Sequence, residues 1–250
     1  MIAGQGTVGL EVLDQVPDAK TVIVPCGGGG LLSGIAAAVK GLNPGVRVVG
    51  VQAEQAAAFP ASIALGHPVP LGSMATIADG IAVGQPGHTT LHHVSALVDD
   101  VITVSEEAIS RALLMCLERA KLVVEPAGAA GVAALMEEPQ AFTPPVVVIL
   151  SGGNVDPLLM LRVIRHGLIA AGRYLSFRLR IPDRPGELAR LLGVLADTGA
   201  NVLDVEHLRT GPKLHLDEVE VALQLETRGA NHCDEVLAAL RAEGYPLSFG

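Results

Sequence analysis

Four short runs of apolar, mostly β-branched residues lie in the first 170 residues, and segments with helical spacing separate them. The runs cover residues 21–24, 47–51, 101–104 and 146–150. Unbroken apolar runs are typical of strands that are buried on both faces of a parallel sheet, whose crossover connections are helices. The sequence therefore predicts an α/β fold here, with a parallel sheet as the middle of three layers.

The hydrophobic pattern changes after Gly172. Apolar and polar residues alternate in two segments, which predicts strands with one solvent-facing side, and apolar residues recur at helical spacing in two others. The alternating segments are residues 174–181 and 219–225, and the helical segments are residues 188–195 and 236–240. With a strand after the first helix and a short last strand, the order predicts a small βαββαβ domain. We therefore predict two domains, residues 1–172 and residues 173–250.

The charge and the cysteines exclude several classes of partner. The formal net charge is −9 and no basic cluster is present, so the electrostatic features that bind nucleic acid or an anionic membrane are missing. No apolar run reaches the length of a membrane span. Three scattered cysteines fit neither a disulfide framework nor a zinc site, which indicates reduced thiols in the cytoplasm. We expect small molecules as partners.

The most distinctive local feature is the stretch VPCGGGGLLSG, residues 24–34. A glycine-rich loop between a buried strand and a helix lets backbone N–H groups converge on a phosphate at the helix N-terminus. A dinucleotide-binding loop would place an acid after the next strand, as Glu54 is placed, but the required third glycine is Ser33. A P-loop would need a Lys-Ser or Lys-Thr pair, which is absent after the glycines. The loop predicts phosphate binding of another kind.

A second glycine turn, SGGNVD, follows the last apolar run, and two such turns predict a ligand that lies across the carboxyl ends of neighbouring strands. With these turns the chain resembles the fold-type II pyridoxal phosphate enzymes, specifically the threonine ammonia-lyase family and its relative serine racemase. The matching motifs are GQGTVGLE (4–11), GGGGLLSG (27–34), TIADGIAV (76–83), LVDDVITVSEEAI (97–109), VVEPAGAAGVAAL (123–135) and SGGNVD (151–156).

The resemblance implies a role for particular residues toward pyridoxal phosphate. The cofactor phosphate would be held by Gly27, Gly28, Gly29 and Gly30. Ser151 would place its hydroxyl on the pyridine nitrogen, and Glu125 would lie near the ring. Asp79 and Gly80 would lie on the substrate side of the pocket. A neutral hydroxyl partner leaves the ring a weaker electron sink, which favours prompt loss of a β-leaving group.

Two features indicate that the chain holds no metal. Metal-bearing relatives add a second acid after the first strand-end Glu, whereas Glu54 is followed by an apolar stretch. His88 and His92 are spaced for one helix face, but no acid lies near them in the sequence, so we interpret them as part of a solvated helix. We expect no divalent site.

The lysines depart from the family pattern. The family's Schiff-base lysine and its loop for the substrate carboxylate belong to an N-terminal portion that has no counterpart in these 250 residues. The lysines present are Lys20, Lys40, Lys121 and Lys213, and none lies in the family's lysine motif. We therefore expect a C-terminal part of a threonine ammonia-lyase that is inactive alone, because it lacks the base that removes the α-proton.

The second domain resembles an ACT domain, a βαββαβ module that binds amino acids, through residues 181–210. The resemblance places Asp183 and Asn201 where a regulatory ligand or a partner subunit is met, and it implies feedback by isoleucine or valine and a homo-oligomer. A domain that only dimerises is the alternative. For the whole chain two other functions stay open: a non-catalytic amino-acid-binding regulatory protein, and a serine dehydratase or racemase type of pyridoxal phosphate enzyme.

Overall fold

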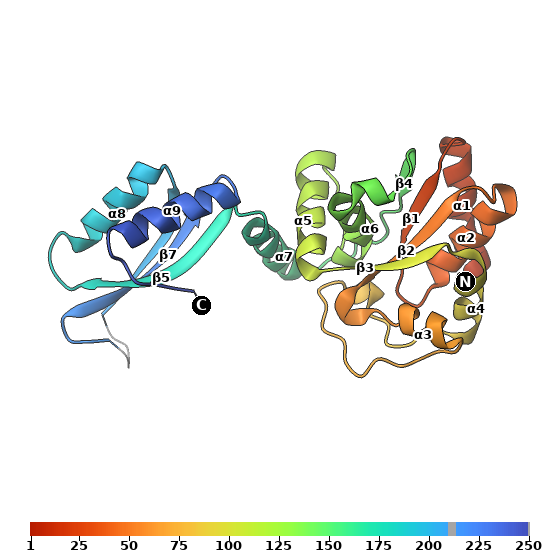
Figure 1. Ribbon diagram of the computed structural model, residues 1–250, viewed down its shortest axis with the longest axis horizontal. Helices are drawn as coiled ribbons and strands as arrows, with labels where there is room; N and C mark the ends of the chain where they lie inside the picture. The colour runs from red at the N-terminus through yellow and green to blue at the C-terminus, as the bar shows by residue number, and fades with distance from the viewer. Residues whose placement is uncertain (210–213, 250) are drawn as a thin grey trace. The chain divides into compact units, whose positions relative to one another are not determined.

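The computed structural model describes residues 1–209 and 214–249, and the chain divides into two compact units, Met1–Gly167 and Leu168–Gly250 (Figure 1). Helix α7 (Pro157–Ala170) runs through the division, and the first strand of the second unit begins at Tyr174. The boundary predicted between residues 172 and 173 therefore falls in the short connection between this helix and this strand, five residues after the division between the units.

The first unit is built on a four-stranded parallel sheet of order β3-β2-β1-β4. Its strands are β1 (Thr21–Pro25), β2 (Arg47–Ala53), β3 (Asp100–Val104) and β4 (Val146–Val148). The four apolar runs of the sequence thus form the four strands, as predicted. Every residue of the central strand β1 is buried, because helices cover both faces of the sheet.

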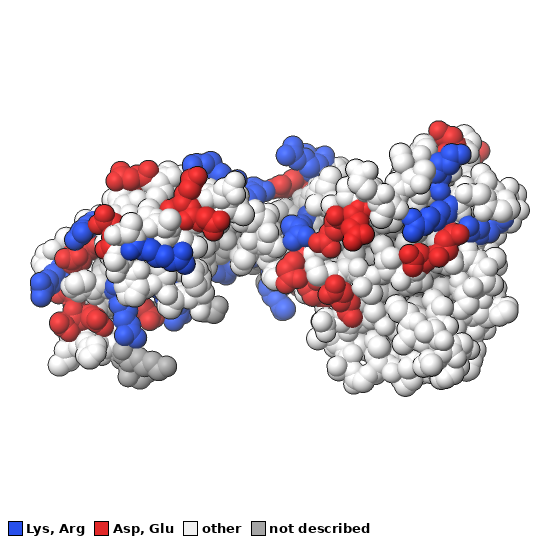
Figure 2. Space-filling model, viewed as in Figure 1, with Lys and Arg blue, Asp and Glu red and all other residues white. Residues whose placement is uncertain are grey.

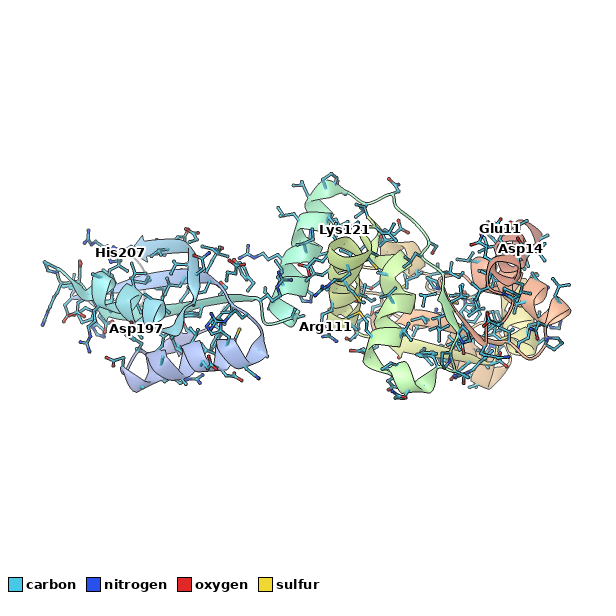
Figure 3. The ribbon with its side chains drawn as sticks, turned by 90° about the horizontal axis from the view of Figure 1, so that it is seen from above. Glu11, Asp14, Arg111, Lys121, Asp197 and His207 are labelled. Carbon is cyan, nitrogen blue, oxygen red and sulfur yellow. The ribbon has the colours of Figure 1, made fainter. Side chains whose placement is uncertain are left out.

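Helices pack on both faces of this sheet, which gives the predicted three layers (Figure 1). Helices α1 (Ile2–Gln15), α2 (Gly30–Leu42), α3 (Phe59–Leu65) and α4 (His88–Leu97) contribute to the core on one face. Helices α5 (Glu106–Met115), α6 (Pro126–Glu137) and α7 contribute to the core on the other. The acids of α1 that Figure 3 labels, Glu11 and Asp14, are exposed.

The edge of the sheet differs from the prediction of strands buried on both faces. Strand β3 has only β2 beside it, and Thr103 is exposed to solvent. Strand β4 is shorter than its apolar run, since regular pairing with β1 ends at Val148. An apolar run therefore located each strand but not its place at the centre or the edge of the sheet.

In the sequence, Ser105 followed by Glu106 and Glu107 predicts an N-cap and first turn of a helix that runs through Arg119. Helix α5 begins as predicted but ends differently. The Ser105 hydroxyl accepts a hydrogen bond from the backbone N–H of Ala108, and two acids in the first turn complement the helix dipole. The α-helix stops at Met115 and continues as a π-helical turn, Cys116–Ala120, instead of running on to Arg119. Lys121 closes that turn in the left-handed conformation, with φ +60°.

In its described residues, the second unit is an antiparallel sheet of order β6-β7-β5-β8 with two helices on one face. Its elements are β5 (Tyr174–Pro182), α8 (Glu187–Thr198), β6 (Asn201–Leu208), β7 (Glu218–Glu226), α9 (Ala230–Ala242) and β8 (Leu247–Ser248). The core is formed by the apolar residues that alternate along β5 and β7 and by leucines and a valine from the helices. This is the predicted βαββαβ order.

Over the described residues of both units, no helix combines the length and apolar character that a membrane span requires.

Candidate cofactor site

A cleft of about 350 Å³ opens at the carboxyl ends of β1 and β4. The glycine loop follows β1, and Ser151 follows β4 after a short connection. Because β1 and β4 are parallel neighbours, their carboxyl ends lie at one edge of the sheet, and both segments line the cleft. Its wall contains residues 27–30, Gly80, Glu125 and Ser151, so every predicted cofactor or substrate residue except Asp79 lines one cleft.

The glycine loop has the shape of an anion cradle. Gly29 has φ +83°, and a Cβ on it would lie 2.5 Å from Cζ of the buried Phe59 ring, so no larger residue fits. A Cβ on Gly27 would lie 3.0 Å from the Cα of Ile81. Helix α2 begins at Gly30, and the N–H groups of its first turn have no intrahelical acceptor. These groups and the helix dipole favour a phosphate at this end of the cleft.

Cys26, directly before the glycine loop, is a packing residue. Its side chain is buried, and burial raises the pKa of its thiol to about 12. A thiol that stays protonated at neutral pH is a poor nucleophile. The side chain therefore contributes to the core beneath the loop and not to the chemistry above it.

Glu125 is seated between two glycines from distant segments. A Cβ on Gly152, which has φ +86°, would lie 2.1 Å from Oε1 of Glu125, and a Cβ on Gly80 would lie 2.7 Å from the same atom. The backbone N–H of Glu125 also donates a hydrogen bond to the carbonyl of Gly152 at 3.2 Å. The absence of side chains at Gly80 and Gly152 thus makes room for this carboxyl group in the wall of the cleft.

The position of Glu125 makes its carboxyl group easier to protonate. Burial raises its pKa above the ordinary value, and the negative charge of Asp79 raises it further. Asp79 itself is exposed and does not line the cleft, although Gly80 does. Asp79 and Glu125 both line an adjacent hollow near Asp156, so the structure brings Asp79 to the neighbourhood of the cleft without placing it in the wall.

Ser151 is held in place by its backbone. A Cβ on Gly128 would lie 1.9 Å from the carbonyl oxygen of Ser151, so helix α6 approaches this residue as closely as its backbone allows. The side chain of Ser151 is half-buried and lines the cleft. Its hydroxyl forms no hydrogen bond within residues 1–209 and 214–249, which leaves it available to a ligand.

Sequence reasoning missed one residue that supports the site. The sequence presents Glu106 only as an acid in the first turn of a helix, but its Oε2 accepts a hydrogen bond from the backbone N–H of Ile77 at 2.8 Å. This bond ties the N-terminus of α5 to the segment that carries Asp79 and Gly80. In the sequence, the pair Glu106-Glu107 after a capping serine indicates only a helix start. It does not reveal that Glu106 bonds to the backbone of Ile77.

The lysines that the structure describes lie outside the cleft. Lys40 pairs with Asp99 at 2.7 Å, and the amine of Lys121, labelled in Figure 3, donates to the carbonyl of Glu118 at 2.7 Å. Lys20 is exposed at the end of the segment before β1 and does not line the cleft either. Lys213 lies outside the described residues.

The two residues expected to meet a regulatory ligand lie at opposite ends of the second sheet. Asn201 opens β6 opposite Glu226, to which its amide donates a hydrogen bond at 3.2 Å. Asp183 follows the last residue of β5 and forms an ion pair with Arg209 at 3.2 Å. Since β5 and β6 run in the same direction on either side of β7, one copy of the chain cannot bring both side chains to one small ligand.

No group of three or more His, Cys, Asp or Glu side chains is arranged to hold a metal ion in the part of the chain that the structure describes. His88 and His92 lie on α4, and both are exposed.

Comparison with known proteins assigns the first unit. Residues 1–152 match the sequence model of the family described as pyridoxal-phosphate dependent enzyme. The chain belongs to this family. Residues 176–244 match the ACT domain, so the chain carries a family domain followed by an ACT domain, as the sequence motifs indicated.

Relatives and solved structures agree with this assignment. The L-threonine ammonia-lyase of Thermotoga maritima is 43% identical over 247 residues, which are 99% of this chain and 62% of that protein. The protein of the same name from Geobacter sulfurreducens is 43% identical over 98% of this chain and 61% of its own length. The chain thus spans less than two thirds of these curated relatives.

Among solved structures, the T.th. threonine deaminase has a TM-score of 0.61 and 41% identity, covering 62% of this chain and 58% of that one. Maize serine racemase has a TM-score of 0.59 and 43% identity, covering 64% of this chain and 52% of that one. The fold-type II assignment made from the motifs is confirmed. Pyridoxal phosphate is the cofactor of this family, and the glycine cradle and the free Ser151 hydroxyl fit a phosphate and a polar ring.

We predict that Gly29→Ala lowers the free energy of unfolding by about 1–3 kcal/mol, because the new methyl group meets the buried Phe59 ring and the left-handed backbone is strained. Gly72→Ala is the matched control, since no atom lies within 4 Å of its Cβ position and its φ is not positive. Urea unfolding followed by circular dichroism measures both variants. Equal midpoints for the two variants would contradict the prediction.

We predict that the pKa of Glu125 in the folded protein lies above its ordinary value of 4.5 and falls in the variant Asp79→Asn without reaching that value, because burial is the larger cause. With a raised folded pKa, the folded protein binds more protons than the unfolded chain between the two values, so stability decreases as pH rises through that window. A carbon NMR titration of the Glu125 carboxyl group measures the shift. A folded pKa at or below 4.5 would refute burial as the dominant influence on this group.

Proposed function

We propose that the chain serves in a threonine ammonia-lyase, which converts L-threonine to 2-oxobutanoate and ammonia with pyridoxal phosphate. The observation that carries this proposal is the identity of 43% to the L-threonine ammonia-lyase of Thermotoga maritima over 247 residues, which include both units of this chain. The geometry of the cleft supports it, because the glycine loop of residues 27–30, the Ser151 side chain and the Glu125 carboxyl group all line one cleft.

The residues of the cleft have separate roles in this proposal. Backbone N–H groups of residues 27–30 hold the cofactor phosphate at the N-terminus of α2. Ser151 donates its hydroxyl to the pyridine nitrogen and, being neutral, supplies no full proton to it. When bound, the cofactor provides an electron sink for the electrons released at the substrate α-carbon. Because a hydroxyl partner is neutral, the cofactor would withdraw electrons only moderately. This favours β-elimination over reactions that need a longer-lived carbanion.

Glu125 provides the ionisable side chain in the wall of the cleft. Its raised pKa lets the carboxyl group be protonated at a higher pH than an exposed glutamate, in the cleft that Ser151 also lines. Gly80 lines the cleft and leaves room for the Glu125 carboxyl group, and Asp79 lies just outside the wall.

We propose that these 250 residues do not carry out the reaction unaided, because the lysines that the structure describes lie outside the cleft. The purified chain is expected to release no 2-oxobutanoate from L-threonine in the presence of pyridoxal phosphate, with a complete threonine ammonia-lyase as the positive control. L-serine in parallel tests the serine dehydratase alternative. Product formation, lost on substitution of one of the four lysines by alanine, would assign the reaction to this chain and overturn the proposal.

We propose further that the ACT domain binds a branched-chain amino acid, isoleucine or valine, and that the protein is a homo-oligomer of the cytoplasm that serves isoleucine biosynthesis. The separation of Asp183 from Asn201 supports an oligomer, since a site that uses both residues needs two copies of the chain. In such a site one copy would contribute the loop after β5 and the other the start of β6.

Asn201→Ala is expected to weaken isoleucine binding by roughly tenfold, because the amide supplies a hydrogen bond to the ligand's charged end. Asn43→Ala is the control, since Asn43 is an exposed residue of the first unit, which the proposed regulatory site does not include. Calorimetry with L-isoleucine at chain concentrations on both sides of the oligomerisation midpoint measures the change. Tight binding by Asn201→Ala would exclude the residue from the regulatory site.

A further inference from the structure

The side chain of Gln5, in the first turn of α1, lines the cofactor cleft beside the glycine loop. It is half-buried, and its amide group forms no hydrogen bond within residues 1–209 and 214–249. Gln5 belongs to the motif GQGTVGLE, which contributes no other residue to the lining of this cleft. An unpartnered polar group in the wall of a binding cleft is a candidate for contact with the ligand.

Close packing of α1 on α2 fixes the position of Gln5. A Cβ on Gly34 would lie 2.4 Å from the carbonyl oxygen of Ile2 and 2.8 Å from the Cβ of Gln5. A Cβ on Gly6 would lie 3.1 Å from the carbonyl oxygen of Gly34, so glycine lets the two helix backbones come into contact. Gly34 follows Gly30 by about one helical turn. The Gln5 side chain therefore starts about one turn from the place where α2 meets the glycine loop.

The lining of the cleft offers a phosphate no side-chain cation. Among the described residues that line it, none is a Lys, an Arg or a His. The sequence has no Lys or Arg between Arg47 and Arg111, and on the face drawn in Figure 2 the surface over α3 and α4 shows neither. A phosphate in this cleft is therefore held by neutral donors, which are backbone N–H groups and side-chain amide or hydroxyl groups.

Of the polar side chains that line the cleft in the described part of the chain, Gln5 is the one suited to donate to the phosphate. Thr90 gives its hydroxyl proton to the carbonyl of Gly87 at 3.1 Å. Glu125 is a carboxyl group, whose ionised form repels a phosphate. Ser151 follows the neighbouring strand β4 and is assigned to the pyridine ring. A glutamine amide carries two N–H donors, and in Gln5 both are uncommitted.

We propose that the side-chain amide of Gln5 is a further ligand of the cofactor phosphate and donates to it from the α1 side of the glycine loop. The proposal rests on the assignment of the phosphate to residues 27–30, and it adds a side chain to a set of donors that is otherwise backbone. Helix α1 is then part of the cofactor site. Gly6 and Gly34, which let α1 approach α2, act by placing this amide.

The test is an NMR titration of the full 250-residue chain, labelled with ¹⁵N. The probe is pyridoxine 5′-phosphate, which has no aldehyde and so forms no imine with a lysine; pyridoxine, which lacks the phosphate, is the comparison probe. Pyridoxine 5′-phosphate is expected to shift the amides of residues 28–30. Gln5→Ala is expected to weaken its binding roughly tenfold, and Gln5→Glu to weaken it further because the new carboxylate repels the phosphate.

The loss is expected for the phosphate-bearing probe alone, with pyridoxine bound equally by all these chains. Gln15→Ala and Gln15→Glu are the matched controls, since Gln15 is an exposed residue at the other end of the same helix, and both are expected to keep wild-type affinity. Amide spectra of the free variants establish that they fold. These controls separate a contact with the phosphate from a general effect of changing α1.

The possible failures are distinguishable. Wild-type affinity of Gln5→Ala for pyridoxine 5′-phosphate, with normal shifts of the glycine-loop amides, would refute the Gln5 contact and leave the cradle standing. An equal loss of affinity for pyridoxine would show a general disturbance of the cleft and would also overturn the proposal. Absence of shifts at residues 28–30 in the wild-type chain would count against the cradle itself and the Gln5 contact with it.

Discussion

The parallel pairing of β1 with β4 is the constraint on which the cofactor site depends. It aligns the carboxyl ends of two strands that lie more than a hundred residues apart in the chain, and so brings the glycine loop and Ser151 to one cleft. The pairing is stable because helices bury both faces of the sheet, and every residue of β1 is buried between them. A parallel ladder that is buried in this way cannot shift register without moving apolar side chains into the wrong layer.

Glycine determines how closely the segments around the cleft approach one another. Gly128 lets α6 contact the backbone of Ser151, and Gly80 and Gly152 leave the space that the carboxyl group of Glu125 occupies. The close approach also explains the raised pKa of Glu125, because the surrounding segments exclude water from it and leave Asp79 nearby. The residues that shape the cleft therefore also raise the pKa of Glu125.

The strands of the second unit bury every second side chain, whereas the central strand β1 of the first unit buries every residue. Along β5 and β7 every second residue enters the core beneath α8 and α9, and the others form a charged, helix-free face. Proline at position 246 ends the pairing of the edge strand and leaves that face hollowed. The ion pairs on this face are solvent-exposed and contribute little to stability.

The sequence by itself determined the kinds of element, their order and the motifs. The four apolar runs became four parallel strands, the alternating segments became β5 and β7, and Ser105 capped its helix, because these outcomes depend on local spacing and local hydrogen bonds. Only the tertiary structure determined that β3 lies at an edge, that Glu106 holds Ile77, and that Asp183 and Asn201 lie at opposite ends of a sheet. Each of these depends on strand order or on a contact between distant segments, and none is encoded in the period of a single segment.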